Sequence, residues 1–334
     1  MLDDRKSAIL RAVVQQYIST AQPVGSSTVA ARDDVAVSSA TVRNDMTVLE
    51  REGYLVQPHT SAGRIPTEKG YRFFVDGLGG AGEGLSPTNV RRVRDFFTAA
   101  HGELEQMLKD TTHLLASLTD NAAVVVGEQP EAATLRSVQL VDLSPRTLLT
   151  VVVLSNGVVL KRTVELAADV DRDEVDDATS LVASELVGHP LHEVGAWAAP
   201  AGAPGAALAG IAAGALHEAA HGEGTQVFVD GASRIAGSFD ARETVAQVLG
   251  ILEQQFVVVT LLKDLVDQGM TVAIGSETGI ETLADCSLVV APYGPGGEVA
   301  GTIAVLGPTR MDYSETLSAV AMVSQRLSRT LTEG

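Results

Sequence analysis

The chain has 334 residues, of which 45% are hydrophobic and only 4% aromatic, and it carries a formal net charge of −18. So acidic a composition argues against a general nucleic-acid coat protein, because non-specific binding to phosphates depends on Lys and Arg. A chain of this length suggests two or three domains, and its single cysteine, Cys286, excludes an internal disulfide.

The charge is unevenly spread along the chain. Residues 1–75 hold nine Lys and Arg against eight Asp and Glu, whereas the remaining 259 residues hold 15 against 34. A nearly neutral head on an acidic body would bind non-specific DNA weakly. A DNA-binding function would therefore depend on specific contacts, on a paired head, or on both.

Three helices are predicted at the start of the chain. Apolar residues recur with helical spacing between residues 3 and 21, and a short second helix follows at 25–32. A turn at 33–37 then leads to a third helix. Two helices joined by such a tight turn are typical of a helix-turn-helix.

The third helix has one apolar and one polar face. Ser38 or Ser39 can cap its N-terminus, and Gly53 provides a left-handed stop. At about 100° per residue, one stripe contains Val42, Met46 and Leu49. The opposite side contains Ala40, Arg43, Asn44, Thr47 and Arg51. Such side chains suit a helix that enters the major groove of DNA, which is about 12 Å wide, and contacts base edges.

Specific roles are predicted for this polar face. Arg43 can donate two hydrogen bonds to guanine and Asn44 to adenine, and each good pair contributes about 1–3 kcal/mol of discrimination. Ala40 or Thr47 is predicted to contact a thymine methyl or to act as a spacer. Ser38 and Ser39 are predicted to be caps first and phosphate contacts second. The alternative for the whole face is an ordinary solvated helix surface.

A two-stranded wing is predicted after the third helix. Its strands are expected at 54–57 and 64–65, with a polar tip at 58–63. The predicted DNA contacts of the wing are His59, Thr60, Ser61 and Arg64. Arg64 is best placed to reach a phosphate or the minor groove, whereas the other three could form no more than a polar loop tip.

A further helix is predicted from Pro66, and a glycine-rich joint follows it at 77–84. The first domain is therefore expected to span residues 1–77. Beyond the joint, apolar periodicity predicts one long helix over 86–118, as a connector or a dimer-facing helix.

The rest of the chain alternates between strand-like and helix-like segments. Strands are predicted at 122–127, 136–142, 147–154, 157–164, 225–230, 270–275, 286–291 and 301–306. Helices are predicted at 178–187, up to 221, at 241–267 and at 313–331. Asn156-Gly157 is a strong signal for a hairpin. Strands on both sides of a helical block predict an α+β sheet domain with an insertion at roughly 166–224.

Two segments could suggest other classes of protein. The uncharged run 194–216 is long enough for a membrane span, but its prolines and glycines predict a loop and a buried Ala-rich helix in a cytoplasmic protein. Residues 217–221 read HEAAH, the spacing of zinc metalloproteases. Gly222 and Gly224 end this helix at once and no third-ligand motif follows, so no metal site is predicted and an incidental pair of histidines is preferred.

Four blocks of the sequence stand out: SSATVRNDMTVLEREGYLVQPHTSAGRIPTEKGYRFFVDGL at 38–78, FVDGAS at 228–233, VAIGSET at 272–278 and CSLVVAPYGPGGEVAGTIAVLGPTRMDY at 286–313. Through these blocks the sequence resembles the HrcA family of heat-inducible transcription repressors over nearly its whole length. The resemblance implies a multidomain α+β fold with four segments. These are a winged helix-turn-helix at 1–77, a connector helix and the first part of a GAF-like domain at 78–165, an inserted dimerisation domain at 166–224, and the second part of the GAF-like domain at 225–334.

The resemblance also implies a homodimer without enzymatic activity or cofactor. This dimer would repress chaperone operons by binding an inverted-repeat operator in double-stranded DNA, with its activity maintained by the GroE chaperonin. One departure is the negative charge of Asp33 and Asp34 in the turn before the third helix. Two alternatives stay open: a ligand-sensing winged-helix regulator that uses its GAF-like domain, and a zinc metalloprotease that uses residues 217–221.

Overall fold

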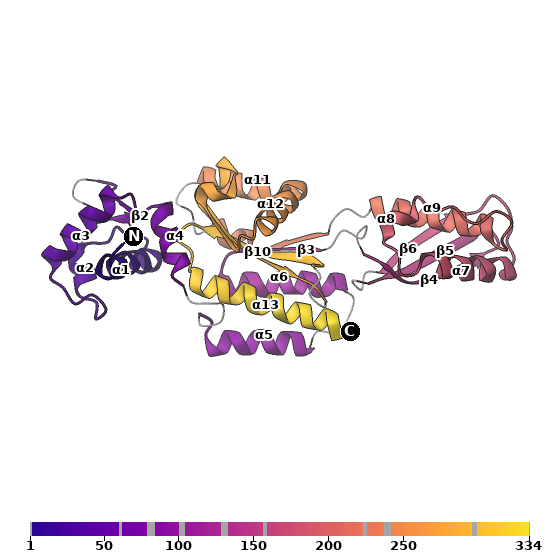
Figure 1. The fold of residues 1–334 in the computed structure, drawn as a ribbon, viewed down its shortest axis with the longest axis horizontal. Helices are drawn as coiled ribbons and strands as arrows, with labels where there is room; N and C mark the ends of the chain where they lie inside the picture. Colours follow the sequence, from indigo (N-terminus) through magenta and orange to yellow (C-terminus); the bar gives the residue numbers. More distant parts are fainter. Residues whose placement is uncertain are drawn as a thin grey trace.

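Three groups of elements lie in a row in the computed structural model of the chain (Figure 1). We call them the head (residues 2–78), the central unit and the inserted unit (residues 133–222). The structure describes residues 2–59, 62–78, 84–99, 104–127, 133–155, 159–222, 226–236, 239, 242–295 and 299–333.

The head is built from helices and one small hairpin. Its elements are α1 (Asp4–Thr20), α2 (Ser26–Ala30), α3 (Ser39–Arg51), β1 (Leu55–Val56), β2 (Ile65–Pro66) and α4 (Glu68–Asp76). Strands β1 and β2 pair antiparallel. The N-termini of α1, α3 and α4 are capped by Asp3, Ser38 and Thr67, whose side chains accept from backbone N–H groups. The three helices and the hairpin predicted for this region are confirmed.

The central unit is a three-layer structure around an antiparallel sheet. Its strands are β3 (Ala122–Gly127), β7 (Val227–Asp230), β8 (Val272–Ile274), β9 (Cys286–Tyr293) and β10 (Gly301–Pro308), in the order β7-β3-β10-β9-β8. The helices α5 (Pro87–Ala99), α6 (Leu104–Thr119) and α13 (Tyr313–Glu333) lie on one side in Figure 1. The opposite side has α11 (Arg242–Glu253) and α12 (Gln255–Asp267). The short helix α10 (Ala232–Ala236) shares a hydrophobic cluster with these two helices.

Strand β3 shows how the two layers of helices share the sheet. Ala123 and Val125 belong to the hydrophobic cluster that contains α6 and α13, whereas Val124 and Val126 belong to the cluster that contains α11 and α12. Successive side chains of a strand point to opposite faces, so a strand covered on both faces must be apolar throughout. Every residue of β3 is buried, which explains its uninterrupted small and β-branched sequence.

The single helix predicted over 86–118 is wrong. The structure has two helices in this stretch, α5 and α6, and both pack against α13. Each helix buries its own apolar face, with Val93 from α5 and Leu115 from α6 in the same hydrophobic cluster. The spacing of apolar residues shows which face of a helix is buried, but it does not show where the chain changes direction. The sequence pattern therefore predicted one helix where the structure has two.

The inserted unit is a three-stranded sheet covered by helices on one face. It comprises β4 (Leu135–Ser144), β5 (Thr147–Leu154), β6 (Val159–Glu165), α7 (Arg172–Leu186), α8 (Leu191–Val194) and α9 (Ala206–Gly222). The sheet order is β4-β5-β6, and the helices share one hydrophobic cluster with it. The hairpin signal Asn156-Gly157 lies outside the described residues, but β5 and β6 pair antiparallel across it.

The insertion begins earlier than predicted. Strands β4, β5 and β6 were assigned to the central sheet domain, with the insertion starting at residue 166, but they form a separate sheet whose core includes α7 and α9. The chain leaves the central sheet after β3 and returns at β7, which pairs with β3. A strand pattern shows that a segment is extended, but it does not show which sheet the segment joins. The sequence therefore did not reveal that the insertion begins before β4.

The other segment predictions are largely confirmed. All strands predicted from residue 122 onwards are present within two residues of their expected bounds. Helix α9 is the buried Ala-rich helix expected in the uncharged run, with Ala209, Ala212 and Ala213 fully or almost fully buried. Among the described residues no single helix is long and apolar enough to cross a membrane, although α11 and α12, bent by 87°, reach that length and composition as a pair.

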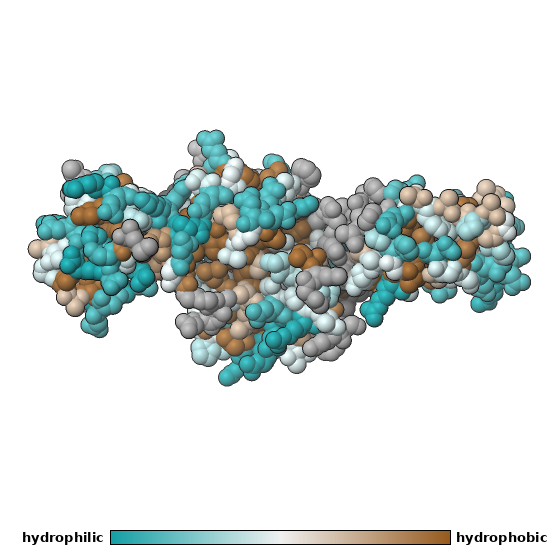
Figure 2. Space-filling model, in the orientation of Figure 1, coloured by the Kyte–Doolittle hydropathy of each residue, from teal (hydrophilic) through white to brown (hydrophobic). Residues whose placement is uncertain are grey.

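The head and the central unit share one hydrophobic cluster. Tyr71 of α4 lies beside Tyr313 of α13, with ring centroids 6.0 Å apart. Figure 2 shows apolar side chains along the middle of the central unit and hydrophilic side chains over much of the head. Burial in the second cluster raises the pKa of the Cys286 thiol to about 12, so this cysteine is a protonated core residue.

The shared cluster leads to a stability prediction. Leu115 is fully buried between α6 and its neighbours, so Leu115→Ala should lower the free energy of unfolding by about 2–5 kcal/mol through lost contacts and a cavity. Denaturant titration followed by circular dichroism measures this loss. The matched control is Leu143→Ala, because Leu143 is 56% exposed and its truncation should change the midpoint little. Equal effects of the two substitutions would contradict the assigned core.

Candidate nucleic-acid interface

Helix α3 presents its polar face to solvent. The buried residues of its apolar stripe are Val42, Met46 and Leu49. The exposed residues of the opposite face are Ala40, Arg43, Asn44, Thr47 and Arg51. The predicted contact residues of α3 therefore lie together on one accessible surface, because packing against α1 and α2 uses the other side of the helix.

The two arginines of this surface are unusual among the cations of the head. Most other cations of the head pair with carboxylates: Arg5 with Asp45, Lys6 with Asp3, Arg32 with Asp34, Arg64 with Glu50 and Arg72 with Glu277. In the described part of the chain, neither Arg43 nor Arg51 has an ion-pair partner. Their guanidinium groups are available to acceptors outside the protein, such as phosphate or base-edge oxygens.

Polar contacts fix α3 in the head. The Ser38 side chain caps the helix by accepting from the Thr41 backbone N–H at 3.2 Å. The Ser39 hydroxyl lies 3.1 Å from that of Ser26 on α2. The Arg5 guanidinium donates to the buried Asp45 carboxylate at 2.8 and 3.3 Å, which joins α1 to α3. Both serines predicted to contact DNA thus have structural partners within the head.

Thr47 and the preceding turn have local partners as well. The Thr47 hydroxyl donates to the Arg43 carbonyl at 3.0 Å, so its methyl group is the part left for an apolar contact. In the turn, a side-chain hydrogen bond from Arg32 lowers the pKa of Asp34. The pair with Arg32 partly offsets the negative charge of this turn, in which both Asp33 and Asp34 are exposed.

The hairpin is held against α3 and the α1–α2 connection. The Arg64 side chain is only 16% exposed, and its guanidinium donates to Glu50 at 3.0 and 3.3 Å. Backbone hydrogen bonds of 2.9 Å join Arg64 and Val24 in both directions. The group expected to reach a phosphate is therefore engaged within the head. His59 is exposed near the tip, while Thr60 and Ser61 lie outside the described residues.

Sequence reasoning missed the residues that position this surface. Glu50 orients Arg64, and Asp45 receives Arg5. A usable signal was present for Asp45, because it falls beside Met46 on the apolar side of α3 and a buried carboxylate needs a cation or hydrogen-bond donors. No local signal identifies Arg5 as its partner, 40 residues earlier.

The HEAAH segment forms the C-terminal part of α9. The His217 ring packs against the Gly195 backbone, where an added Cβ would collide with it, so this imidazole faces the inserted unit. The side chain of His221 lies outside the described residues. Among the residues that are described, no group of three His, Cys, Asp or Glu side chains is placed to hold a metal ion.

Comparisons with known proteins point to one family. The family described as "HrcA protein C terminal domain" matches residues 105–317. The chain is 38% identical to the heat-inducible transcription repressor HrcA of Nocardioides sp., with 100% of both chains covered. It is 39% identical to the repressor of the same name from Nocardia farcinica, covering 99% of this chain and 97% of the relative. The full-length relatives therefore include the head, which the family match leaves out.

The fold is similar to that of a solved structure. It is described as the crystal structure of a hypothetical protein, and it matches with a TM-score of 0.66 and 23% identity. The alignment covers 100% of this chain and 99% of that chain. The similarity thus extends over all three units.

The Arg64–Glu50 pair is tested by a double-mutant cycle. Arg64→Ala, Glu50→Ala and the double variant should show a coupling of about 1 kcal/mol in the free energy of unfolding, because the pair is partly buried. Chemical denaturation of the four proteins measures it. Strict additivity of the two single substitutions would mean that the pair does not hold the hairpin on α3.

Proposed function

The chain belongs to the HrcA family of heat-inducible transcription repressors, and we propose that it acts as a homodimer on an inverted-repeat operator of chaperone genes in the cytoplasm. The main support for DNA binding is the exposed face of α3. This face has an asparagine and two arginines that lack ion-pair partners among the described residues. The homologous repressors are the second support.

We propose that the head is a winged helix-turn-helix. Helices α2 and α3 are its two helices, and the β1–β2 hairpin is its wing. Helix α3 enters the major groove, where Arg43 reads guanine and Asn44 reads adenine. Ala40 and the Thr47 methyl contact thymine methyl groups. The N-terminus of α3 at Ser38 and Ser39 lies against a phosphate, since its free N–H groups and dipole favour an anion.

The wing acts mainly through its tip in this proposal. His59, Thr60 and Ser61 follow the DNA backbone beside the groove. Arg64 holds the wing at the correct angle to α3 through Glu50, and it adds a phosphate contact only where the DNA draws it away from that carboxylate. The wing therefore contributes affinity that depends little on sequence.

The outer face of the inserted sheet is the proposed dimer surface. Alternate residues of β5 are buried under α7 and α9, so the residues between them point to the uncovered face. The apolar members of that face are Val141, Leu149, Val151, Val153 and Val159. A partly exposed apolar sheet face marks an association site, and a second copy would present the identical surface about a two-fold axis.

Dimerisation also explains how an acidic protein holds DNA. Since the body repels phosphates, one head with few free cations has limited affinity, and two heads on one operator act together. A two-fold dimer places its recognition helices in successive major grooves of an inverted repeat. Occupation of such a site near a promoter blocks transcription.

Dependence on the GroE chaperonin fits the topology of the central sheet. Strand β3 pairs with β7 and with β10, whose residues lie more than a hundred positions later in the chain. Sheets with such distant partners fold slowly and expose apolar surface while they do so. We therefore propose that the chaperonin refolds the repressor, and that heat withdraws this help as other unfolded proteins compete for it.

The base-reading role of Arg43 is tested by comparing two DNA sequences. Arg43→Ala should weaken binding to the cognate operator by roughly ten- to a hundredfold and binding to random DNA much less, because a bidentate pair to guanine contributes about 1–3 kcal/mol. The operator is first located by footprinting DNA upstream of chaperone operons. Arg91→Ala on α5 removes the same charge outside the head and is the matched control. Equal losses on both DNAs would exclude base reading.

The dimer surface is tested by placing a charge at its centre. Val151→Asp should convert the dimer to monomers and abolish cooperative occupation of the inverted repeat, since an unpaired buried carboxylate is strongly unfavourable. Analytical ultracentrifugation measures the change in mass. Val299→Asp is the control, because Val299 is 57% exposed and lies outside the inserted unit. A Val151→Asp protein that stays dimeric would exclude this surface.

A further inference from the structure

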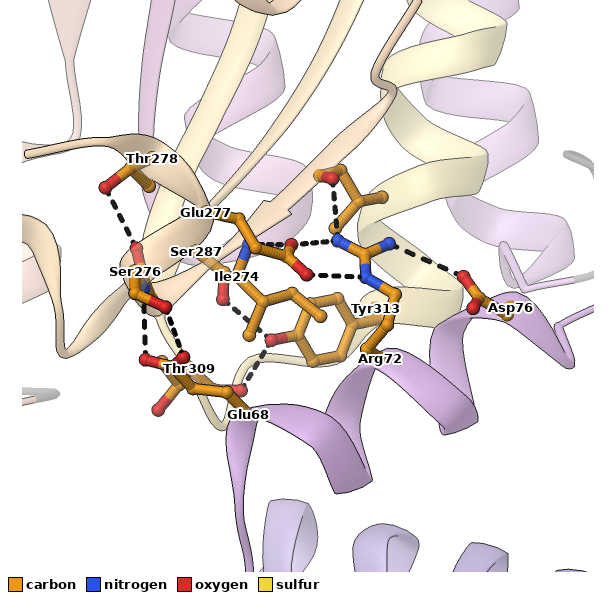
Figure 3. Close-up of polar contacts among 12 residues, drawn as sticks. Glu68, Arg72, Asp76, Ile274, Ser276, Glu277, Thr278, Ser287, Thr309 and Tyr313 are labelled. Carbon is orange, nitrogen blue, oxygen red and sulfur yellow. Dashed lines mark hydrogen bonds and ion pairs between the residues drawn. The ribbon is translucent and has the colours of Figure 1, made fainter. Parts of the chain in front are cut away.

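Helix α4 of the head is fastened to the turn η2 (Gly275–Thr278) of the central unit. The Arg72 guanidinium forms two hydrogen bonds with the Glu277 carboxylate, the one from Nε at 2.9 Å, and donates to the Val272 carbonyl at 2.9 Å. Glu68 accepts from the backbone N–H and the hydroxyl of Ser276 (Figure 3). We call these contacts the latch. They join residues about two hundred positions apart in the chain.

The turn that carries the latch also forms one wall of a groove. The groove has a volume of about 510 Å³, and its other wall is α12. Helix α12 contributes Leu261, Asp264 and Leu265, while the turn side contributes Glu277 and Ile280. This volume lies within the range of small-molecule sites, and one wall of the groove is the turn that forms the latch.

The lining defines the chemistry of a ligand. Leucine and isoleucine side chains provide apolar contacts, and none of the described residues that line the groove is basic. Asp264 is exposed and has no side-chain partner among the described residues. Burial raises the pKa of Glu277, but hydrogen bonds from Arg72 and the Ile274 backbone outweigh that effect and lower it, so this carboxylate is ionised. An anionic ligand would be repelled here.

We propose that this groove binds a small organic cation, an amine carried on an apolar body, and that the bound cation loosens the latch. The apolar body lies against Leu261, Leu265 and Ile280, and the ammonium group lies between Asp264 and Glu277. There it competes with Arg72 for the Glu277 carboxylate. Binding thereby changes the freedom of the head relative to the central unit.

The coupling must act in both directions. If the cation weakens the latch, then a protein with a broken latch must bind the cation more tightly, because a coupling free energy is reciprocal. Arg72→Gln removes the competing guanidinium from Glu277. Glu68→Gln weakens the other half of the latch without touching Glu277 and serves as a second variant.

The test uses the full chain and 2-phenylethylamine as the probe. Isothermal titration should give saturable binding with a Kd on the order of millimolar, as fits so small a ligand. The uncharged analogue 2-phenylethanol should bind at least about fivefold more weakly. Asp264→Asn should weaken amine binding about tenfold, whereas Asp267→Asn on the same helix, whose carboxylate does not line the groove, should not.

Each outcome decides one part of the proposal. Absence of saturable amine binding, equal binding of the alcohol, or equal effects of the two aspartate variants would overturn the site. If Arg72→Gln and Glu68→Gln fail to tighten amine binding at least about fivefold, the coupling to the head is overturned.

Only the effect of the amine on DNA binding rests on the proposed repressor function. A gel-shift titration with amine present should show altered operator affinity, and this change should be absent in Asp264→Asn. Because the binding arms need no DNA, failure of the operator footprint and failure of the groove are distinguishable. A saturable site whose occupation leaves operator affinity unchanged would overturn the regulatory consequence.

Discussion

The arrangement of the molecule depends on the pairing of strand β3. It is buried on both faces and hydrogen-bonded along both edges, to β7 on one side and β10 on the other. These partners come from after the inserted unit and from near the end of the chain, so the central sheet closes only when distant segments meet. The chain leaves the central sheet after β3 and returns at the neighbouring strand β7. The inserted unit can therefore pack around its own core without disturbing the central sheet.

Most cations of the head have a carboxylate partner. Five of its cations are neutralised by carboxylates, and these pairs do structural tasks such as joining α1 to α3 and the hairpin to α3. The exposed arginines of α3 remain on a body that is strongly acidic. Such a distribution disfavours non-specific attachment to DNA, so the proposed operator binding would depend on a small number of side chains.

The latch connects that surface to the rest of the protein. Helix α4 contributes Tyr71 and Phe74 to the hydrophobic cluster shared with the central unit, and it presents Glu68 and Arg72 to turn η2 on its polar side. An apolar contact of this kind is not directional, whereas the paired hydrogen bonds select one orientation. The groove beside η2 shares a wall with the turn that these hydrogen bonds hold.

Local patterns in the sequence determined the elements and the faces of the helices. Helical periodicity identified the two sides of α3, because side-chain direction follows from backbone geometry within a few residues. The sequence offered Ser38 or Ser39 as the cap of this helix, and the structure has Ser38 in that position. Short runs of apolar and β-branched residues bounded by turn residues located the strands of both sheets. The candidate contact residues on α3 could be named from the sequence alone, since exposure on one face follows from burial of the other.

Only the tertiary structure decided which elements and side chains meet. It placed β4, β5 and β6 in their own sheet, separated α5 from α6, and engaged Arg64 with Glu50. It also brought Arg72 to Glu277, 205 residues later in the chain. These contacts form where distant surfaces bury the most apolar area and pair the most charges. The sequence of a single helix or strand does not determine which distant surface that will be.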